Sequence, residues 1–179
     1  MKNLKNAIRN IPDFPKEGIV FRDISTLLGN YSYTESAIDQ MIAPFQTQKI
    51  DCVLGVESRG FIFGSMIAQR LKCNFVMVRK AGKLPYNTYR SAFQTTYGSG
   101  ELEIQQDALQ DNDSILIVDD VLAAGGTTSA VLSLVRNFPT VQVAGLVYLI
   151  ELSFLNGRSK FQGYFAHSVL KYKTANDMD

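Results

Sequence analysis

Short apolar runs alternate along the chain with segments of helical periodicity. Each run is continuous and about four to eight residues long, as expected of strands buried on both faces of a sheet. The runs are Cys52–Val56, Phe75–Val78, Ile115–Val118 and Val143–Ile150. Each of the three helical segments has one apolar side. The residues of these sides are Ile38, Met41, Ile42 and Phe45 in the first segment, Ile62, Met66, Ile67 and Leu71 in the second, and Val131, Leu132, Val135 and Phe138 in the third. This alternation predicts an α/β fold with a parallel sheet, in a single domain over residues 1–179.

Two segments lie outside this alternation. Residues 1–30 look irregular and are broken by prolines and glycines, and the Ser32–Glu35 segment that follows has the pattern of a capping box for the first helix. Residues 86–100 are polar and aromatic without helical period, and Glu101–Gln105 then alternates like a strand. We therefore expect a hairpin-like flap there.

Three polar loops follow three of the predicted strands. They are Glu57–Gly60, Arg79–Lys83 and Asp119–Thr128. Ligands of open parallel sheets bind outside the carboxyl ends of the strands. The three loops are therefore predicted to converge on one site.

The third loop has the features of an anion site. Gly125 and Gly126 follow the strand, and Thr127, Thr128 and Ser129 are good N-cap residues for a helix that begins there. Backbone N–H groups and the helix dipole would then point at a bound phosphate.

Two carboxylates, Asp119 and Asp120, stand where the strand is expected to end. A carboxylate beside a phosphate needs a partner of its own, such as a metal ion or a sugar hydroxyl. A phosphate close to a vicinal diol, as in ribose 5-phosphate, satisfies both requirements.

The other two loops add positive charge. Arg59 offers a planar fork suited to phosphate oxygens, and Arg79, Lys80 and Lys83 lie at the neighbouring strand end. This is more charge than one phosphate monoester requires, so a second anionic group such as pyrophosphate would account for it. For Lys80, a role in the site and a place on a solvated charged face are equally good interpretations.

Composition narrows the class of protein. The 179 residues include 46% hydrophobic and 20% charged residues, and the net charge of +1 gives no general field for nucleic acid or an anionic membrane. Cys52 and Cys73 form no CxxC motif and are interpreted as reduced thiols, and the single histidine, His167, is interpreted as structural. With no signal peptide or bilayer-spanning stretch in this sequence, we expect a cytoplasmic enzyme or binding protein.

The segment Val118-Asp119-Asp120-Val121-Leu122-Ala123-Ala124-Gly125-Gly126-Thr127 resembles the signature of the type I phosphoribosyltransferases. The resemblance is strongest to the adenine-specific members and covers nearly the whole chain. Supporting segments in the same order are Gly18–Ile24, Glu57–Phe61, Arg79–Pro85, Tyr97-Gly98 with Glu101–Ile104, and Ile150–Leu152 with Leu155–Arg158.

The resemblance implies a fold and a reaction. The fold is an open, mainly parallel sheet flanked by helices, with a small N-terminal hood over residues 1–30, a mobile flap over 86–100 and the phosphoribosyl-binding motif at 115–129. The reaction is magnesium-dependent transfer of a 5-phosphoribosyl group from phosphoribosyl pyrophosphate to N9 of adenine, giving AMP and pyrophosphate in purine salvage. The magnesium would be held mainly by the pyrophosphate substrate and water, and a homodimer without nucleic-acid or membrane partners is expected.

Residue roles follow from the resemblance. The segment Ala123, Ala124, Gly125, Gly126 and Thr127 would bind the 5-phosphate, with Asp119 and Asp120 facing the ribose hydroxyls. Arg59 and the backbone of Glu57 and Ser58, which members join by a cis peptide, would hold pyrophosphate, assisted by Arg79 and Lys83. Val20 and Arg22 would contact the adenine edge through their backbone while Phe21 stacks on the ring, and Tyr97 matches a family position on the flap.

Three positions depart from the family pattern. Ala124 replaces the usual threonine of the phosphate loop, which predicts weaker binding and not loss of activity. Ala81 stands where many members have arginine or proline. Thr96 occupies the place before Tyr97 where members usually have a catalytic glutamate, and Glu101 is the nearest candidate to replace it.

Two other functions stay open. A hypoxanthine or guanine enzyme of the same fold would need a different base site, and the Val20–Arg22 and Ser58–Gly60 segments argue against it. A regulator that senses the ribosyl phosphate without turnover is compatible with Thr96, but the chain carries no basic surplus.

Overall fold

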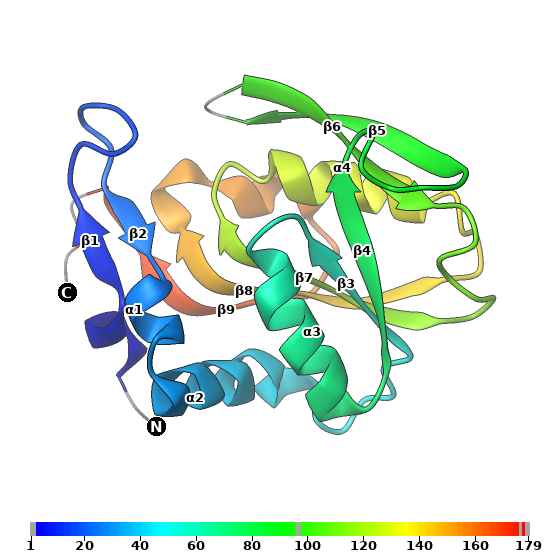
Figure 1. Ribbon diagram of the computed structural model, residues 1–179, viewed down its shortest axis with the longest axis horizontal. Coiled ribbons are helices and arrows are strands. Elements are labelled where there is room, and N and C mark those ends of the chain that lie inside the picture. The colour runs from blue at the N-terminus through cyan, green and yellow to red at the C-terminus, as the bar shows by residue number, and fades with distance from the viewer. Residues whose placement is uncertain (1–2, 96–97, 176, 178–179) are drawn as a thin grey trace.

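A computed structural model describes residues 3–95, 98–175 and 177. Its centre is a seven-stranded sheet with the order β5-β6-β4-β3-β7-β8-β9 (Figure 1). The five strands from β4 to β9 are parallel, and β5 and β6 form an antiparallel hairpin at one edge. The strands span Cys52–Val56 (β3), Asn74–Lys80 (β4), Thr88–Thr95 (β5), Gly98–Gln105 (β6), Ser114–Leu122 (β7), Gln142–Leu152 (β8) and Ala166–Tyr172 (β9). The predicted α/β fold class is thereby confirmed.

The apolar runs identified four of these strands but not their full length. β3 has the predicted bounds, whereas β4, β7 and β8 extend by polar or charged residues beyond the runs. The acids Asp119 and Asp120 lie within β7 and not at its end, which corrects the prediction. The reason is that the long strand β8 continues to pair with β7, with Asp119 opposite Tyr148 and Leu122 opposite Glu151. Sequence periodicity did not identify β9.

Helices cover both faces of the sheet. Tyr31–Ile42 (α2) and Gly60–Leu71 (α3) pack on one face with the inward side chains Val53 and Leu116. Gly126–Val135 (α4) packs on the other face against Leu54 and Ile117. Neighbouring residues of one strand therefore belong to different cores, as the alternation of side chains across a sheet requires.

Helix α2 begins differently from the prediction. The Asn30 side chain caps it by accepting hydrogen bonds from the N–H groups of Ser32 and Tyr33, at 3.1 and 3.3 Å. Ser32 and Glu35 therefore lie inside the helix, and the predicted capping box was wrong. Asparagine is among the best N-cap residues, and its position one residue before the helix explains the earlier start.

The first thirty residues contain short regular elements rather than only irregular chain. Leu4–Ala7 (η1) is followed by Arg9–Ile11 (β1), Phe21–Asp23 (β2) and Ser25–Leu28 (α1). Strands β1 and β2 form a separate antiparallel ribbon, at the left of Figure 1. At the opposite side of the fold, the β5–β6 hairpin lies over α4, as the predicted hairpin-like segment suggested.

The remaining connections include Ala43–Phe45 (η2), Ser153–Leu155 (η3) and Gly157–Phe161 (η4). The ring Nε2 of His167 lies 2.9 Å from the backbone oxygen of Gln40, so this histidine joins β9 to α2, in line with a structural role. Cys52 and Cys73 are free thiols. Across the described helices, none is both long and apolar enough to span a bilayer.

Phe45 provides a test of the core under the sheet. Its ring is fully buried and lies against the backbone of Gly145, where a Cβ atom would collide with it. We expect Phe45→Ala to lower the free energy of unfolding by about 3–5 kcal/mol, because the cavity cannot collapse against a rigid strand. Urea unfolding measures this change.

The matched control is Tyr31→Ala at the exposed start of α2. Its effect should stay within about 0.5 kcal/mol. Equal effects of the two substitutions would contradict the assigned burial of Phe45.

Candidate active site

The three polar loops predicted to converge do meet at the carboxyl edge of the sheet. Glu57 follows β3, and two cationic side chains pair with its carboxylate. Arg79 Nε, on β4, lies 3.2 Å from it, and Lys83 Nζ, in the turn after β4, lies 3.1 Å from it. Arg59 Nε lies 2.8 Å from Asp120 Oδ2 on β7. Ion pairs therefore join β3 to both neighbouring strands.

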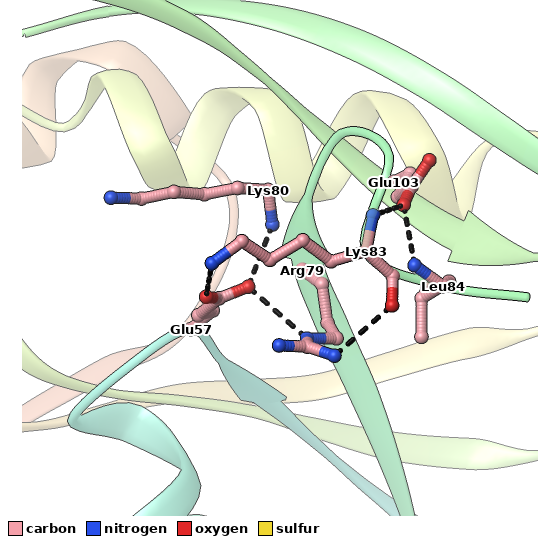
Figure 2. A network of polar contacts seen from close by, with 6 residues as sticks. All are labelled: Glu57, Arg79, Lys80, Lys83, Leu84 and Glu103. Atoms are coloured by element: carbon pink, nitrogen blue, oxygen red, sulfur yellow. Dashed lines mark hydrogen bonds and ion pairs between the residues drawn. The ribbon is translucent and has the colours of Figure 1, made fainter.

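Glu57 is the centre of the first cluster (Figure 2). Its side chain is 9% exposed, and Oε2 also accepts the N–H of Lys80 at 3.0 Å. Burial opposes ionisation, but the hydrogen bonds from Lys80 N, Lys83 and Arg79 together lower the pKa of Glu57. The carboxylate therefore stays ionised and holds the two cationic side chains beside each other. Glu57 and Ser58 are joined by a cis peptide bond.

A second carboxylate, Glu103, shapes the turn that carries Lys83. Glu103 is fully buried on β6, and its Oε1 accepts the N–H groups of Lys83 and Leu84, both at 2.8 Å (Figure 2). Arg90 Nε lies 3.2 Å from Oε2. Sequence reasoning missed this residue. Its signal was a charged residue between the apolar Leu102 and Ile104, since a carboxylate in such a place needs local partners.

Asp119 and Asp120 point to different surroundings, as expected of successive strand residues. Asp120 is 6% exposed, and its Oδ2, although close to Arg59, has no hydrogen-bond partner among the described residues. Asp119 Oδ1 accepts the N–H of Asp120 at 2.9 Å and packs against Gly60. Burial and then the Asp120 charge raise the pKa of Asp119 well above its usual value. Burial also raises the pKa of Asp120, against the effect of Arg59.

The glycine loop after β7 turns directly into α4. Gly125 has φ of +76° and occupies the N-cap position, so the helix begins at Gly126. Thr127, Thr128 and Ser129 are consequently helical residues and not N-caps, which corrects the prediction. A glycine takes the cap position because the left-handed backbone there is costly for other residues. The first N–H groups of α4 remain available to an anion.

Close backbone packing holds this loop in place. A Cβ atom on Gly125 would lie 2.5 Å from the Gly157 oxygen, and one on Gly157 would collide with the Ala123 oxygen. The neighbouring Arg158 fixes η4, because its Nε and Nη2 donate to the Glu151 carboxylate at 2.8 and 2.7 Å. Gly157 and Arg158 therefore support the loop from behind, a role that the sequence alone did not reveal.

A cavity of about 460 Å³ lies between this loop and the N-terminal ribbon. Most of the predicted site residues line it, namely Val20, Phe21, Arg22, Arg59, Asp120, Ala123, Ala124, Gly125, Gly126 and Thr127. The Arg59 guanidinium lies 5.1 Å from the Phe21 ring centroid, and the Phe14 ring meets Phe21 edge-on at 5.2 Å. The Phe21 ring, the Asp120 carboxylate and the N-terminus of α4 thus face the same cavity.

Two predicted catalytic residues are not among those that line the cavity. Glu101 is exposed on β6, where its backbone oxygen accepts the Ala81 N–H at 2.9 Å. Tyr97, like its neighbour Thr96, lies outside the described residues.

Comparison with known proteins identifies the family to which this chain is similar. The model of the phosphoribosyl transferase domain family matches residues 34–153. Adenine phosphoribosyltransferase of Nitrosococcus oceani is 44% identical over 172 residues, which are 96% of this chain and 100% of the relative. This chain belongs to the adenine phosphoribosyltransferase family.

Solved structures of this family have the same fold. The enzyme of Rhodothermus marinus superposes with a TM-score of 0.88 at 45% identity, over 94% of this chain and 96% of that one. The enzyme of Saccharomyces cerevisiae, crystallised with adenine and an imino-altritol bisphosphate, gives 0.87 at 37% identity, over 93% and 96%.

The raised pKa of Asp119 predicts a pH-dependent effect of removing its charge. Because the folded-state pKa lies above the unfolded one, Asp119 favours folding when protonated, and this contribution is lost as pH rises through the folded-state value. Asp119→Asn keeps the acceptor for Asp120 N–H and removes the charge. We expect it to raise the free energy of unfolding by about 1 kcal/mol at pH 7 and to have little effect near pH 4.

Urea unfolding of the wild type and the variant across this pH range measures the difference. Asp113→Asn, in the turn before β7, is the control for removing a carboxylate at the opposite end of the same strand. A gain that is the same at both pH values would contradict the assigned burial of the Asp119 charge.

Proposed function

We propose that this chain transfers the 5-phosphoribosyl group of phosphoribosyl pyrophosphate to N9 of adenine and releases AMP and pyrophosphate. This is a pentosyltransferase reaction of purine salvage. The observation that carries the proposal is the cavity that joins the N-terminal ribbon, Asp120 and the glycine loop. Base, ribose and phosphate can each meet a matching group there. Family membership supports the same reaction.

Adenine is assigned to the ribbon side of the cavity. Phe21 would stack on the purine ring, and the backbone groups of Val20 and Arg22 would bind its edge. The Arg59 guanidinium near the Phe21 ring supports this, since an aromatic face and a planar cation are both suited to a flat heterocycle. The residues 1–30 would thereby act as a hood over the base.

The 5-phosphate is assigned to residues 123–127. The N-terminal N–H groups of α4 and the helix dipole favour a dianion at this position. Ala124 contributes its backbone but no hydroxyl, so this loop binds with one hydrogen bond fewer than a threonine would allow. The segment 115–129 is the phosphoribosyl-binding motif in this proposal.

The ribose hydroxyls are assigned to Asp119 and Asp120. Asp120 Oδ2 is a buried acceptor whose partner among the described residues is Arg59, in an ion pair at 2.8 Å, and a sugar hydroxyl would add a hydrogen bond to it. As the bond to pyrophosphate weakens, positive charge develops on the ribose ring. The Asp120 carboxylate in its ionised form would stabilise that charge, because it is fixed in a site of low dielectric.

The leaving pyrophosphate is assigned to Arg59, Arg79, Lys83 and the backbone of Glu57 and Ser58. Arg79 and Lys83 are already oriented by Glu57, so little rearrangement is needed to place them. Magnesium bound to pyrophosphate supplies further neutralisation of the leaving group. The residues fit this arrangement, because Glu57 and Asp120 are paired with cationic side chains and leave most ligand positions to the substrate and water.

Residues 86–100 are assigned as a flap that excludes water from the reacting centre. Tyr97 on this flap and Glu101 directly after it are the candidate catalytic residues. Glu101 lies on β6, beside the turn that carries Lys83.

We further propose a homodimer in the cytoplasm. The free thiols Cys52 and Cys73 suit a reducing compartment. Within the described residues, β6 pairs with β4 only at Arg79 and Lys80, and the open part of β4 carries the exposed Met77. An open strand with an exposed apolar residue is a suitable contact for a second copy.

The activity is tested by mixing the protein with phosphoribosyl pyrophosphate and magnesium and offering adenine, hypoxanthine or guanine. We expect AMP from adenine and little product from the other two bases. Turnover of hypoxanthine or guanine alone would overturn the base assignment. Binding of phosphoribosyl pyrophosphate without any turnover would instead favour a regulator.

The support of the glycine loop by Gly157 gives a second prediction. In Gly157→Ala the new methyl group must displace the Ala123 oxygen, so the loop moves away from its phosphate-binding position. We expect KM for phosphoribosyl pyrophosphate to rise at least about tenfold. Steady-state kinetics at saturating adenine measure it.

Gly163→Ala is the control for the loss of a glycine. Gly163 has φ of +95° and open space around it, so this substitution strains the backbone without touching the loop. A similar rise of KM in both variants would contradict the assigned support.

A further inference from the structure

Among the residues that the structure describes, the N-terminal ribbon forms its own two-stranded sheet and does not pair with the seven-stranded one. β1 and β2 are three residues each, and an isolated two-stranded ribbon is only marginally stable in water. Under the proposed function, this ribbon carries the groups that bind adenine. Its position over the cavity therefore depends on how side chains attach it to the rest of the fold.

Arg22 is the attachment at the centre of the ribbon. The residue is 4% exposed, although it lies in a three-residue strand near the surface. Its Nη1 donates to Asn10 Oδ1 on β1, and its Nη2 donates to the Ala175 oxygen at 2.9 Å. One guanidinium thus joins both strands of the ribbon to the C-terminal segment.

Tyr172 provides the surface under this guanidinium. It is 1% exposed at the end of β9, and its ring centroid lies 4.2 Å from Arg22 Cζ. At this distance the aromatic face attracts the cation. Tyr172 belongs to the main sheet, so the contact fixes the ribbon relative to the strands that carry Asp120 and the glycine loop.

The C-terminal segment adds a second connection. Lys5, just before the ribbon, has its Nζ 3.3 Å from Asp177 Oδ1 and 5.0 Å from the Tyr172 ring centroid. Asp177 Oδ2 accepts the Lys173 N–H at 2.9 Å. Lys5 thus contacts both Tyr172 and Asp177.

Stability does not explain the attachment through Arg22, because burying this side chain lowers the free energy of unfolding. Burial of Arg22 removes its charge from water, and its Nε has no hydrogen-bond partner among the described residues. A packed apolar residue is often more favourable than a buried charge. The Arg22 contact is unfavourable for folding and has a specific geometry, and it lies beside a binding site. These properties indicate that it serves to position the ribbon.

We propose that the Arg22 side chain, Tyr172 and the C-terminal residues Lys173, Ala175 and Asp177 position the N-terminal ribbon over the cavity and thereby set the affinity for the purine base. Tyr172 and these C-terminal residues are positioning residues, because they do not line the cavity. Arg22 lines the cavity, and its guanidinium has a positioning role through its contacts with Asn10, Ala175 and Tyr172. The proposal rests on the proposed function for its kinetic consequence, but its structural part does not need turnover.

The first test is Tyr172→Leu, which removes the aromatic face and keeps an apolar residue. We expect KM for adenine to rise about tenfold, while KM for phosphoribosyl pyrophosphate and kcat change less than about twofold. Tyr172→Phe keeps the aromatic face and should restore KM for adenine. An equal rise of both KM values, or no rise, would overturn the proposal.

Arg9→Gln is the matched control on the ribbon. Arg9 is an exposed arginine of β1 that lies 3.8 Å from Asp23, and its removal leaves the Arg22 contacts intact. It should leave both KM values near those of the wild type. A rise of KM for adenine as large as that in Tyr172→Leu would show that any disturbance of the ribbon has this effect, and would overturn the specific role of Arg22 and Tyr172.

Hydrogen exchange separates this proposal from the proposed function. In Tyr172→Leu, the amides of residues 9–23 should exchange at least about tenfold faster, while those of β7 and β8 keep their protection. This result is expected even if adenine is not a substrate. Unchanged exchange of the ribbon would overturn the proposal.

Arg22→Lys is the second variant if Tyr172→Leu does not fold. It keeps the charge and loses the planar fork that reaches both Asn10 and Ala175. The same selective loss of protection in residues 9–23 supports the proposal, and wild-type protection overturns it.

Discussion

The site depends on carboxyl groups that are buried, oriented and paired at the carboxyl edge of a parallel sheet. Asp120 occupies a buried position in β7. Its charge is paired with Arg59, from the loop after β3. The Asp120 charge is unfavourable there without Arg59, because a buried charge without a partner is strongly destabilising. The pairing of β3 with β7 in register brings the two side chains together.

The same principle orders the positive side of the site. Glu57 holds Arg79 and Lys83, and Glu103 fixes the turn on which Lys83 stands (Figure 2). Like-charged side chains would otherwise separate into solvent. Two buried carboxylates thus prepare a cationic surface for an anion, so the reorganisation required on binding is small.

The anion loop itself is shaped by backbone contacts instead of charge. Gly125 and Gly157 allow two chain segments to approach more closely than any side chain would permit. The Glu151–Arg158 pair anchors the second segment from the end of β8. The glycine loop is therefore held by the segment Gly157–Phe161, which follows it in sequence by about thirty residues.

Local sequence predicted the main strands and the chemistry proposed for the loops. Apolar runs identified β3, β4, β7 and β8 because buried parallel strands require continuous hydrophobicity, and the glycines with adjacent acids led to the prediction of an anion site. The ends of β7, the Asn30 cap, the strand β9 and the supporting roles of Glu103, Gly157 and Tyr172 were decided by tertiary structure. These features depend on which segments become neighbours, as when β8 extends β7 past its apolar run or when Tyr172 meets Arg22 across 150 residues of sequence. The residues adjacent in sequence do not indicate such a partner. The sequence therefore predicted which kind of ligand each loop suits, and the tertiary structure determined how each loop is held.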